Sequence, residues 1–306
     1  MKIIMVMAIM CLYNNNIYSQ HTVTIKKGSG QNFTMFQISG DTTKYRFKSK
    51  IAKYKEQYKE AANLLIKAID KGEFEDKEIS LAYYEIACYF SMFKIKDKAV
   101  KYLKESINNG WSDMSKLEFD EKLSFIKDSD EWTKLISPLL VLYYKEHNKE
   151  LAKLYSEDQQ VRLNGQYNNL KVIVQDSIRR FKVMKFIEND KLKSGYDYYK
   201  AAMIMHHGSK TEDYKIAHKL AQKSLKFDST HEMAPWLCAA TKDRLLLSQD
   251  KPQWYGTQGI SVTMNHKIML DPKLIDTTAV STLERRRLNA PTIEKLREYI
   301  NNFKSE

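Results

Sequence analysis

The sequence predicts an all-α protein, and three observations support this fold class. Only 10 Gly and 5 Pro occur among 306 residues, too few for a sandwich or barrel built on many turns. Leu, Ile, Ala, Lys and Glu are abundant instead, and most of these are good helix formers. From about residue 44, apolar residues recur with the period of a helix that buries one face. The length suggests about two domains.

The first twenty residues have the layout of a secretory signal peptide. Lys2 precedes an apolar run over residues 3–13, and a polar stretch follows it. This run is too short to span a bilayer. We therefore expect residues 1–20 to be removed and the mature chain to be periplasmic or extracellular, with no transmembrane segment left. Residues 21–43 carry weak strand signals and form either a short hairpin or a linker.

Two segments of the N-terminal half share one pattern at a fixed offset. Each places a small, a large and a small residue on one helix face, which lets antiparallel helices approach closely. The positions are Ala61, Leu65 and Ala68 in the first segment and Ala99, Leu103 and Ser106 in the second. The pattern resembles the tetratricopeptide repeat. That resemblance implies paired helices within residues 44–136 and a protein partner bound through this module.

The segment after the second repeat has the spacing expected of a cap. Its apolar residues are Trp111, Phe119, Leu123, Ile126 and Trp132. They resemble the terminal segment that often closes tetratricopeptide arrays, because a stack of repeats needs its exposed end covered. Ser137-Pro138 then predicts a break, and residues 139–306 are expected to form a second helical domain with an irregular C-terminal loop. The predicted helices of this domain cover about 139–163, 168–188, 196–207, 211–226, 233–248 and 291–303.

The stretch Pro252–Gln258, sequence PQWYGTQ, concentrates polar chemistry directly after a helix that contains Asp243 and Arg244. Asp243 lies on an otherwise apolar helix face, so its carboxylate must be paired or hydrogen-bonded. One interpretation is a structural role, either a salt bridge or an anchor for the amides of the following loop. The other is that Asp243 and the loop side chains converge on a ligand. The loop residues predicted to bind are Gln253, Tyr255, Gly256, Thr257 and Gln258.

His207 is the best acid–base candidate, because it stands at a predicted helix end where the carbonyl dipoles favour its charged form. His206 and His207 make a poor metal pair, since adjacent helix residues diverge by about a hundred degrees. No recognised nucleophile, metal or phosphate motif occurs, so we expect no metal and no cofactor.

Polar residues over about 145–300 resemble an uncharacterised bacterial family, domain of unknown function 6624. The matching residues are Asp158 and Arg162, Asp197-Tyr198 before Ala201-Ala202, His207, Asp243-Arg244 and the PQWYGTQ loop. The resemblance adds Asp158, Arg162, Asp197 and Arg244 to the predicted ligand-binding residues. It implies no reaction, because the family has no established activity. The chain departs from the family at Asp250-Lys251, where relatives often carry Gly before the loop.

The formal net charge of +12 is spread along the chain with acids between the bases, which is typical of solvated helix faces. No nucleic-acid motif or aromatic-basic stripe occurs, so we expect no specific nucleic-acid partner. Cys88 and Cys238 stand in separate apolar runs and are interpreted as small buried hydrophobic residues.

We therefore predict that the chain is an exported helical binding protein. Its repeat module recruits a protein partner, and its C-terminal domain holds a small polar or protein ligand. One alternative is a hydrolase or transferase that uses His207 as acid or base, with Asp243 orienting it. Another is a structural protein of the cell envelope.

Overall fold

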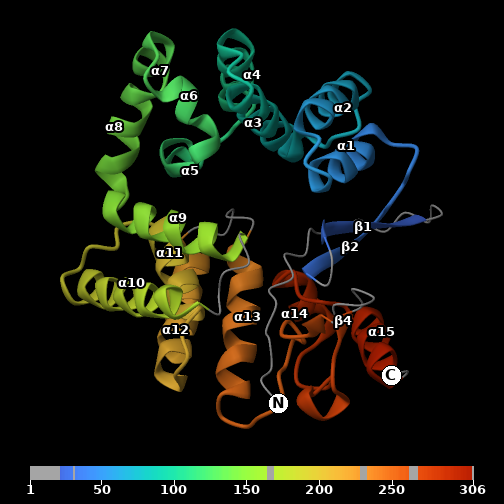
Figure 1. The fold of residues 1–306 in the computed structure, drawn as a ribbon. Helices are drawn as coiled ribbons and strands as arrows, with labels where there is room; N and C mark the ends of the chain where they lie inside the picture. The colour runs from blue at the N-terminus through green and yellow to red at the C-terminus, as the bar shows by residue number, and fades with distance from the viewer. Residues whose placement is uncertain (1–20, 30–31, 164–168, 228–232, 262–267, 305–306) are drawn as a thin grey trace. The chain divides into compact units, whose positions relative to one another are not determined.

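The computed structural model describes residues 21–29, 32–163, 169–227, 233–261 and 268–304 (Figure 1). The predicted signal peptide, residues 1–20, lies outside the described residues. The all-α prediction is confirmed: within these residues helices dominate, and the strands form two antiparallel pairs. The described chain divides into two compact units, an N-terminal one that ends at Tyr143 and a C-terminal one that begins at Tyr144.

The N-terminal unit begins with a hairpin, one of the two forms expected for residues 21–43. Strand β1 (His21–Ser29) pairs with β2 (Asn32–Gly40) in a register that places His21 opposite Gly40. The helices that follow are α1 (Tyr45–Tyr54), α2 (Tyr58–Asp70), α3 (Asp76–Met92), α4 (Lys96–Asn108), α5 (Met114–Phe119), α6 (Ser124–Lys127) and α7 (Asp130–Leu135), with a 3₁₀ turn, η1 (Glu121–Leu123), between α5 and α6.

Consecutive helices of this unit pack as pairs, α1 with α2 and α3 with α4, and α2 also packs on α3. The small residues of the repeated pattern, Ala61, Ala68 and Ala99, are fully buried. The approach is close enough for the Ser49 hydroxyl on α1 to donate to the Ala61 carbonyl on α2 at 2.8 Å. The paired helices therefore pack closely where the small residues lie. The assignment of these pairs to the tetratricopeptide family remains a prediction.

The segment predicted as a cap packs on α3 and α4 through η1 and α6. Leu117, Leu123 and Ile126 are fully buried there. Trp111 stacks on Tyr84 of α3 with ring centroids 4.2 Å apart. The apolar side chains of this segment thus lie on the second helical pair.

The remaining helices are α8 (Ser137–Glu146), α9 (Lys149–Leu163), α10 (Leu170–Glu188), α11 (Gly195–His206), α12 (Thr211–Phe227), α13 (Ala234–Leu247), α14 (Thr282–Arg287) and α15 (Ile293–Lys304), with short strands β3 (Ile260–Ser261) and β4 (Ile268–Met269) and a 3₁₀ turn, η2 (Pro272–Leu274). A helix over 139–163 was expected, but α8 and α9 are separate. Asn148 lies between them, and its side-chain oxygen accepts the Leu151 amide at 2.9 Å and so begins a new helix.

Helix α11 is the centre of the C-terminal unit, because α9, α10, α12 and α13 all pack against it. Figure 1 shows α11, α12 and α13 beside one another. Almost every residue of α11 is buried, including His206 at its last turn. A smaller apolar cluster of Leu270, Ile275, Leu296 and Tyr299 joins the C-terminal helix to the preceding segment. Polar groups at the end of α11 and on α13 therefore lie in a largely dry interior. Within the described residues, no helix combines the length and the apolar character needed to cross a bilayer.

Candidate functional site

The carboxylate of Asp243 anchors the PQWYGTQ loop. Its Oδ1 accepts the backbone amides of Trp254 and Tyr255 at 2.8 and 2.9 Å. Its Oδ2 accepts both the amide and the hydroxyl of Thr257, at 2.9 and 2.8 Å. Asp243 is fully buried; burial raises the pKa of this carboxyl, and the four donated bonds oppose the rise. Of the two interpretations of Asp243, the geometry is that of the loop anchor.

Three further contacts fix the course of the loop. The side chain of Gln253 accepts the Gln258 amide at 3.0 Å and so spans the turn. Gly256 adopts a φ of +73°, and a Cβ there would lie 2.3 Å from the Leu296 side chain. Arg285, fully buried on α14, donates to the carbonyls of Tyr255 and Trp254 at 3.0 and 2.7 Å. Gln253, Gly256 and Thr257, all predicted to bind ligand, therefore hold the loop itself.

Gln258 connects this loop to the end of α11 through Arg244. The Gln258 side-chain oxygen accepts from Nε and a terminal nitrogen of Arg244 at 3.2 and 3.0 Å. The same guanidinium donates to the backbone carbonyl of His206. Burial, with a smaller effect of Arg162, lowers the pKa of Arg244 to about 10, so the guanidinium stays charged at neutral pH.

The carboxylate in contact with His207 is that of Asp158, whose Oδ2 lies 2.7 Å from Nδ1 of the ring. Asp243 was expected to orient this histidine in the enzyme alternative, but its oxygens face the loop amides. The predicted residues thus fall into two linked groups: Asp243 with the loop, and His207 with Asp158 and Arg162. Arg162 lies one helical turn from Asp158 and pairs with it at 3.2 Å.

Two residues that the sequence did not point to complete this buried ionic cluster. Arg162 makes a two-pronged ion pair with Asp176 of α10, at 2.9 and 2.8 Å. Arg179 pairs with the same carboxylate one turn along the helix and lies 3.8 Å from Asp158. The arginine hydrogen bonds hold the pKa of Asp176 below its usual value against the effect of burial. The only sequence signal was Asp176 and Arg179 at i, i+3, a spacing that solvated helix faces share.

Asp197 lies apart from these groups. Its carboxylate accepts the amides of Asn148, at 3.0 and 3.1 Å, and of Lys193, at 2.9 Å. Because Asp197 is in the first turn of α11 and His207 follows the last, the two are separated by roughly 15 Å along the helix. Asp197, predicted to bind ligand, fastens the start of α11 to the turn before α9.

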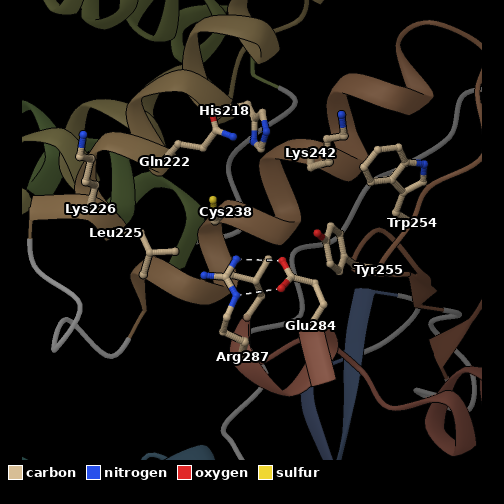
Figure 2. A pocket seen from close by; sticks show the side chains of 11 residues that line it. His218, Gln222, Leu225, Lys226, Cys238, Lys242, Trp254, Tyr255, Glu284 and Arg287 are labelled. Carbon is tan, nitrogen blue, oxygen red and sulfur yellow. Dashed lines mark hydrogen bonds and ion pairs between the residues drawn. The ribbon is translucent and has the colours of Figure 1, made fainter. Parts of the chain in front are cut away.

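A pocket of about 410 Å³ lies between α12, α13, the loop and α14, and Tyr255 is the only predicted site residue in its wall (Figure 2). Trp254 and Tyr255 form one side of it. Leu225, Leu288 and Cys238 supply apolar surface. The charged and polar residues of the lining are His218, Gln222, Lys226, Lys242, Glu284 and Arg287.

The groups that could do chemistry in this pocket are held in unreactive or neutral forms. Burial raises the pKa of the Cys238 thiol to about 11, so the thiol stays protonated. Burial, together with the charge of Lys242, lowers the pKa of His218 to about 4. Glu284 is engaged by Arg287 through two bonds of 2.8 and 2.9 Å. Among the described residues, no group of three His, Cys, Asp or Glu side chains could hold a metal ion.

Apart from Tyr255, the residues of the pocket wall were not predicted as site residues, and the reason is physical. His218, Gln222 and Lys226 follow one another at i, i+4 and i+8 on α12, and Cys238 and Lys242 do so on α13. Polar side chains at this spacing are typical of any solvated helix face. Only the packing of α12 against α13 turns the two faces into one cavity.

A scan of the chain against protein-family models found no match, and searches of curated proteins and of solved structures also returned no similar chain. The two family resemblances stated for the sequence therefore remain predictions, and function has to be inferred from the geometry of the site.

Proposed function

We propose that this protein is an exported binding protein whose C-terminal unit holds a small polar ligand in the pocket beside Tyr255. The pocket itself carries the proposal. A volume of about 410 Å³ falls in the range of small-molecule sites, and its mixture of apolar walls with a few polar groups is typical of them.

The pocket wall is preorganised, which favours binding over a purely structural role. The amides of Trp254 and Tyr255 are held by Asp243, and their carbonyls are held by Arg285. Both partners are fully buried, so the two aromatic residues are fixed before any ligand arrives. A rigid wall loses little conformational entropy on binding, and this lowers the cost of holding a ligand.

The same geometry favours binding over the hydrolase or transferase alternative. His207 has a side chain only 5% exposed, and its carboxylate partner is shared with two arginines. In the pocket, the thiol of Cys238 is kept protonated by burial and therefore makes a poor nucleophile. Neither group offers an activated nucleophile beside a base.

We further propose that the helical pairs of the N-terminal unit recruit a protein partner. The support is a group of apolar side chains at the turn between α3 and α4, where Met92, Phe93 and Ile95 are 40%, 42% and 37% exposed. Replacing all three by Ser should abolish capture of that partner from an extract of the producing cells while leaving ligand binding in the C-terminal unit unchanged.

The pocket proposal is tested with a substitution that fills the cavity. Gln222→Trp places a ring at the pocket from an exposed position on α12, and Lys219→Trp adds the same ring outside the pocket on the same helix. We expect small aromatic probes to raise the melting temperature of the wild type and of Lys219→Trp but not of Gln222→Trp. Equal shifts in all three proteins would contradict binding in this pocket.

A further inference from the structure

We propose that the pocket beside Tyr255 selects a small aromatic carboxylate that also carries a hydrogen-bond donor, such as a hydroxylated benzoate. This inference rests on the proposed function and specifies the chemistry of its ligand. It follows from three properties of the lining: its charge, its apolar surface and the orientation of one imidazole.

The charge of the lining favours an anion. Three cationic side chains, Lys226, Lys242 and Arg287, line the pocket together with one acid, Glu284. Arg287 and Glu284 neutralise each other through their paired bonds, which Figure 2 draws as dashed lines. Neither lysine has an acidic partner within ion-pair distance among the described residues. The pocket therefore keeps a surplus of two positive charges, and an anionic ligand would compensate them.

The position of Lys242 shows where the anionic group would lie. Its Nζ is 4.1 Å from the centroid of the Trp254 ring, so the ammonium is held at the aromatic wall rather than extended into solvent. Lys242 and Trp254 lie together at one side of the pocket in Figure 2. An ammonium next to an apolar surface attracts a carboxylate more strongly than a fully hydrated one does.

The apolar surface favours an aromatic body over a bare inorganic anion. Leu225 of α12, Cys238 of α13 and Leu288 directly after α14 contribute apolar side chains, and Tyr255 adds an aromatic ring. Displacing water from these apolar groups is favourable for binding, and a flat aromatic ring covers them well. Inorganic phosphate would compensate the charges of the two lysines but would leave the apolar surface of the pocket exposed to water.

The imidazole of His218 favours a ligand that carries a hydrogen-bond donor. Its Nδ1 lies 3.1 Å from the Thr241 hydroxyl, which has its own proton directed to the Leu237 carbonyl at 2.8 Å. A ring N–H of His218 also donates to the backbone carbonyl of Cys238. We assign the imidazole proton to Nδ1, because the Thr241 hydroxyl oxygen can accept from Nδ1–H while its own proton is directed to a carbonyl. A neutral imidazole with its proton on Nδ1 has an acceptor lone pair on Nε2. Burial and Lys242 keep the ring neutral through its lowered pKa, so a ligand hydroxyl or N–H finds an acceptor here.

The test uses isothermal titration calorimetry with defined probes on the full chain. The three monohydroxybenzoates are compared with the matching hydroxybenzamides, with benzoate and with inorganic phosphate. We expect at least one hydroxybenzoate to bind about tenfold more tightly than its amide, because a charge-assisted bond is lost, and more tightly than benzoate. Phosphate alone should bind more weakly than that hydroxybenzoate.

Two variants and one control assign the effects to residues. Lys242→Gln should weaken hydroxybenzoate binding about tenfold and leave hydroxybenzamide binding unchanged. His218→Phe should remove the preference for hydroxybenzoate over benzoate. Lys219→Gln removes the same charge from an exposed position of α12. It should change neither the affinity for hydroxybenzoate nor the preference over benzoate.

The outcomes separate this inference from the proposed function. Equal affinities for acids and amides, or an unchanged affinity in Lys242→Gln, would overturn selection of an anion while a small-molecule pocket remained supported. Phosphate binding as tightly as any hydroxybenzoate would overturn the aromatic part. If no aromatic probe of either charge binds to the wild type, the proposed function fails together with this inference.

Discussion

The buried carboxylate of Asp243 accepts the backbone amide of Tyr255 at 2.9 Å, and this contact ties the inner face of α13 to the wall of the pocket. With the bonds to Trp254 and Thr257, this one side chain accepts four of the hydrogen bonds that hold the loop. The loop has no regular structure of its own, so its conformation depends on this acceptor.

We therefore expect Asp243→Asn to destabilise the fold. The amide that replaces one carboxylate oxygen is a donor, and it would face groups that also donate. Leaving buried amides unpaired costs roughly 1–3 kcal/mol, and the loss of charge adds to this. The free energy of unfolding from urea denaturation should fall by that amount or more. Asp250→Asn makes the same change at an exposed position of positive φ, which Asn tolerates, and should leave stability nearly unchanged.

Arg285 provides a second, independent test of the loop. Arg285→Lys keeps the charge but removes the fork that reaches the carbonyls of Tyr255 and Trp254 together. We expect a loss of roughly 1–3 kcal/mol in urea denaturation, since a buried carbonyl is left without its donor. The neighbouring Arg286 is exposed, and Arg286→Lys should have no measurable effect. Similar losses in the two variants would argue that the hydrogen bonds of Arg285 to the loop carbonyls do not stabilise the fold.

The sequence predicted most of the helices because their apolar period is long and regular. Helix α12 (Thr211–Phe227) was expected over 211–226, and α13 (Ala234–Leu247) over 233–248. Helix α14 was missed, since it is only six residues long and buries one large side chain, that of Arg285. The split between α8 and α9 was also missed, because it depends on Asn148 and on a contact with distant Asp197.

The candidate site was predictable only where it is local in sequence. The loop stood out because four polar residues surround Gly256, and Asp243 stood out as an acid on an apolar helix face. Which carboxylate meets His207 depends on how α9 packs against α11, and no local pattern contains that information. The same holds for Lys242 and His218, which meet only across two helices.

The buried ionic cluster yields a prediction about Asp158. Asp158→Asn would remove the carboxylate that contacts His207 and would leave Arg162 and Arg179 to share that of Asp176. Breaking a buried network by removing one partner typically costs about 3–5 kcal/mol. Glu157→Gln, at the exposed neighbouring position of α9, is the matched control. A double-mutant cycle with His207→Gln should give a coupling energy of roughly 0.5–3 kcal/mol, and a coupling of zero would contradict the His207–Asp158 contact.

The lowered pKa of His218 predicts how stability depends on pH. In the folded chain this pKa is about 4, because of burial and the nearby charge of Lys242, whereas an exposed histidine titrates near 6.5. Between these values the unfolded chain binds a proton that the folded chain does not, so stability must fall as pH falls from about 6.5 toward 4. His206 acts in the same direction, because burial, Arg244 and His207 lower its pKa as well.

Removing one of these histidines should therefore flatten the pH profile. We expect His218→Gln to lose less stability than the wild type between pH 7 and pH 5, measured by urea denaturation at each pH. Gln can still donate toward Thr241, so the packing of α12 on α13 should survive the change. Restricting the range to pH 5 and above reduces the contribution of ordinary carboxyl groups, which titrate near pH 4. Parallel profiles for the two proteins would show that His218 titrates alike in the folded and unfolded chains, and the neutral acceptor assigned to the pocket would then be lost.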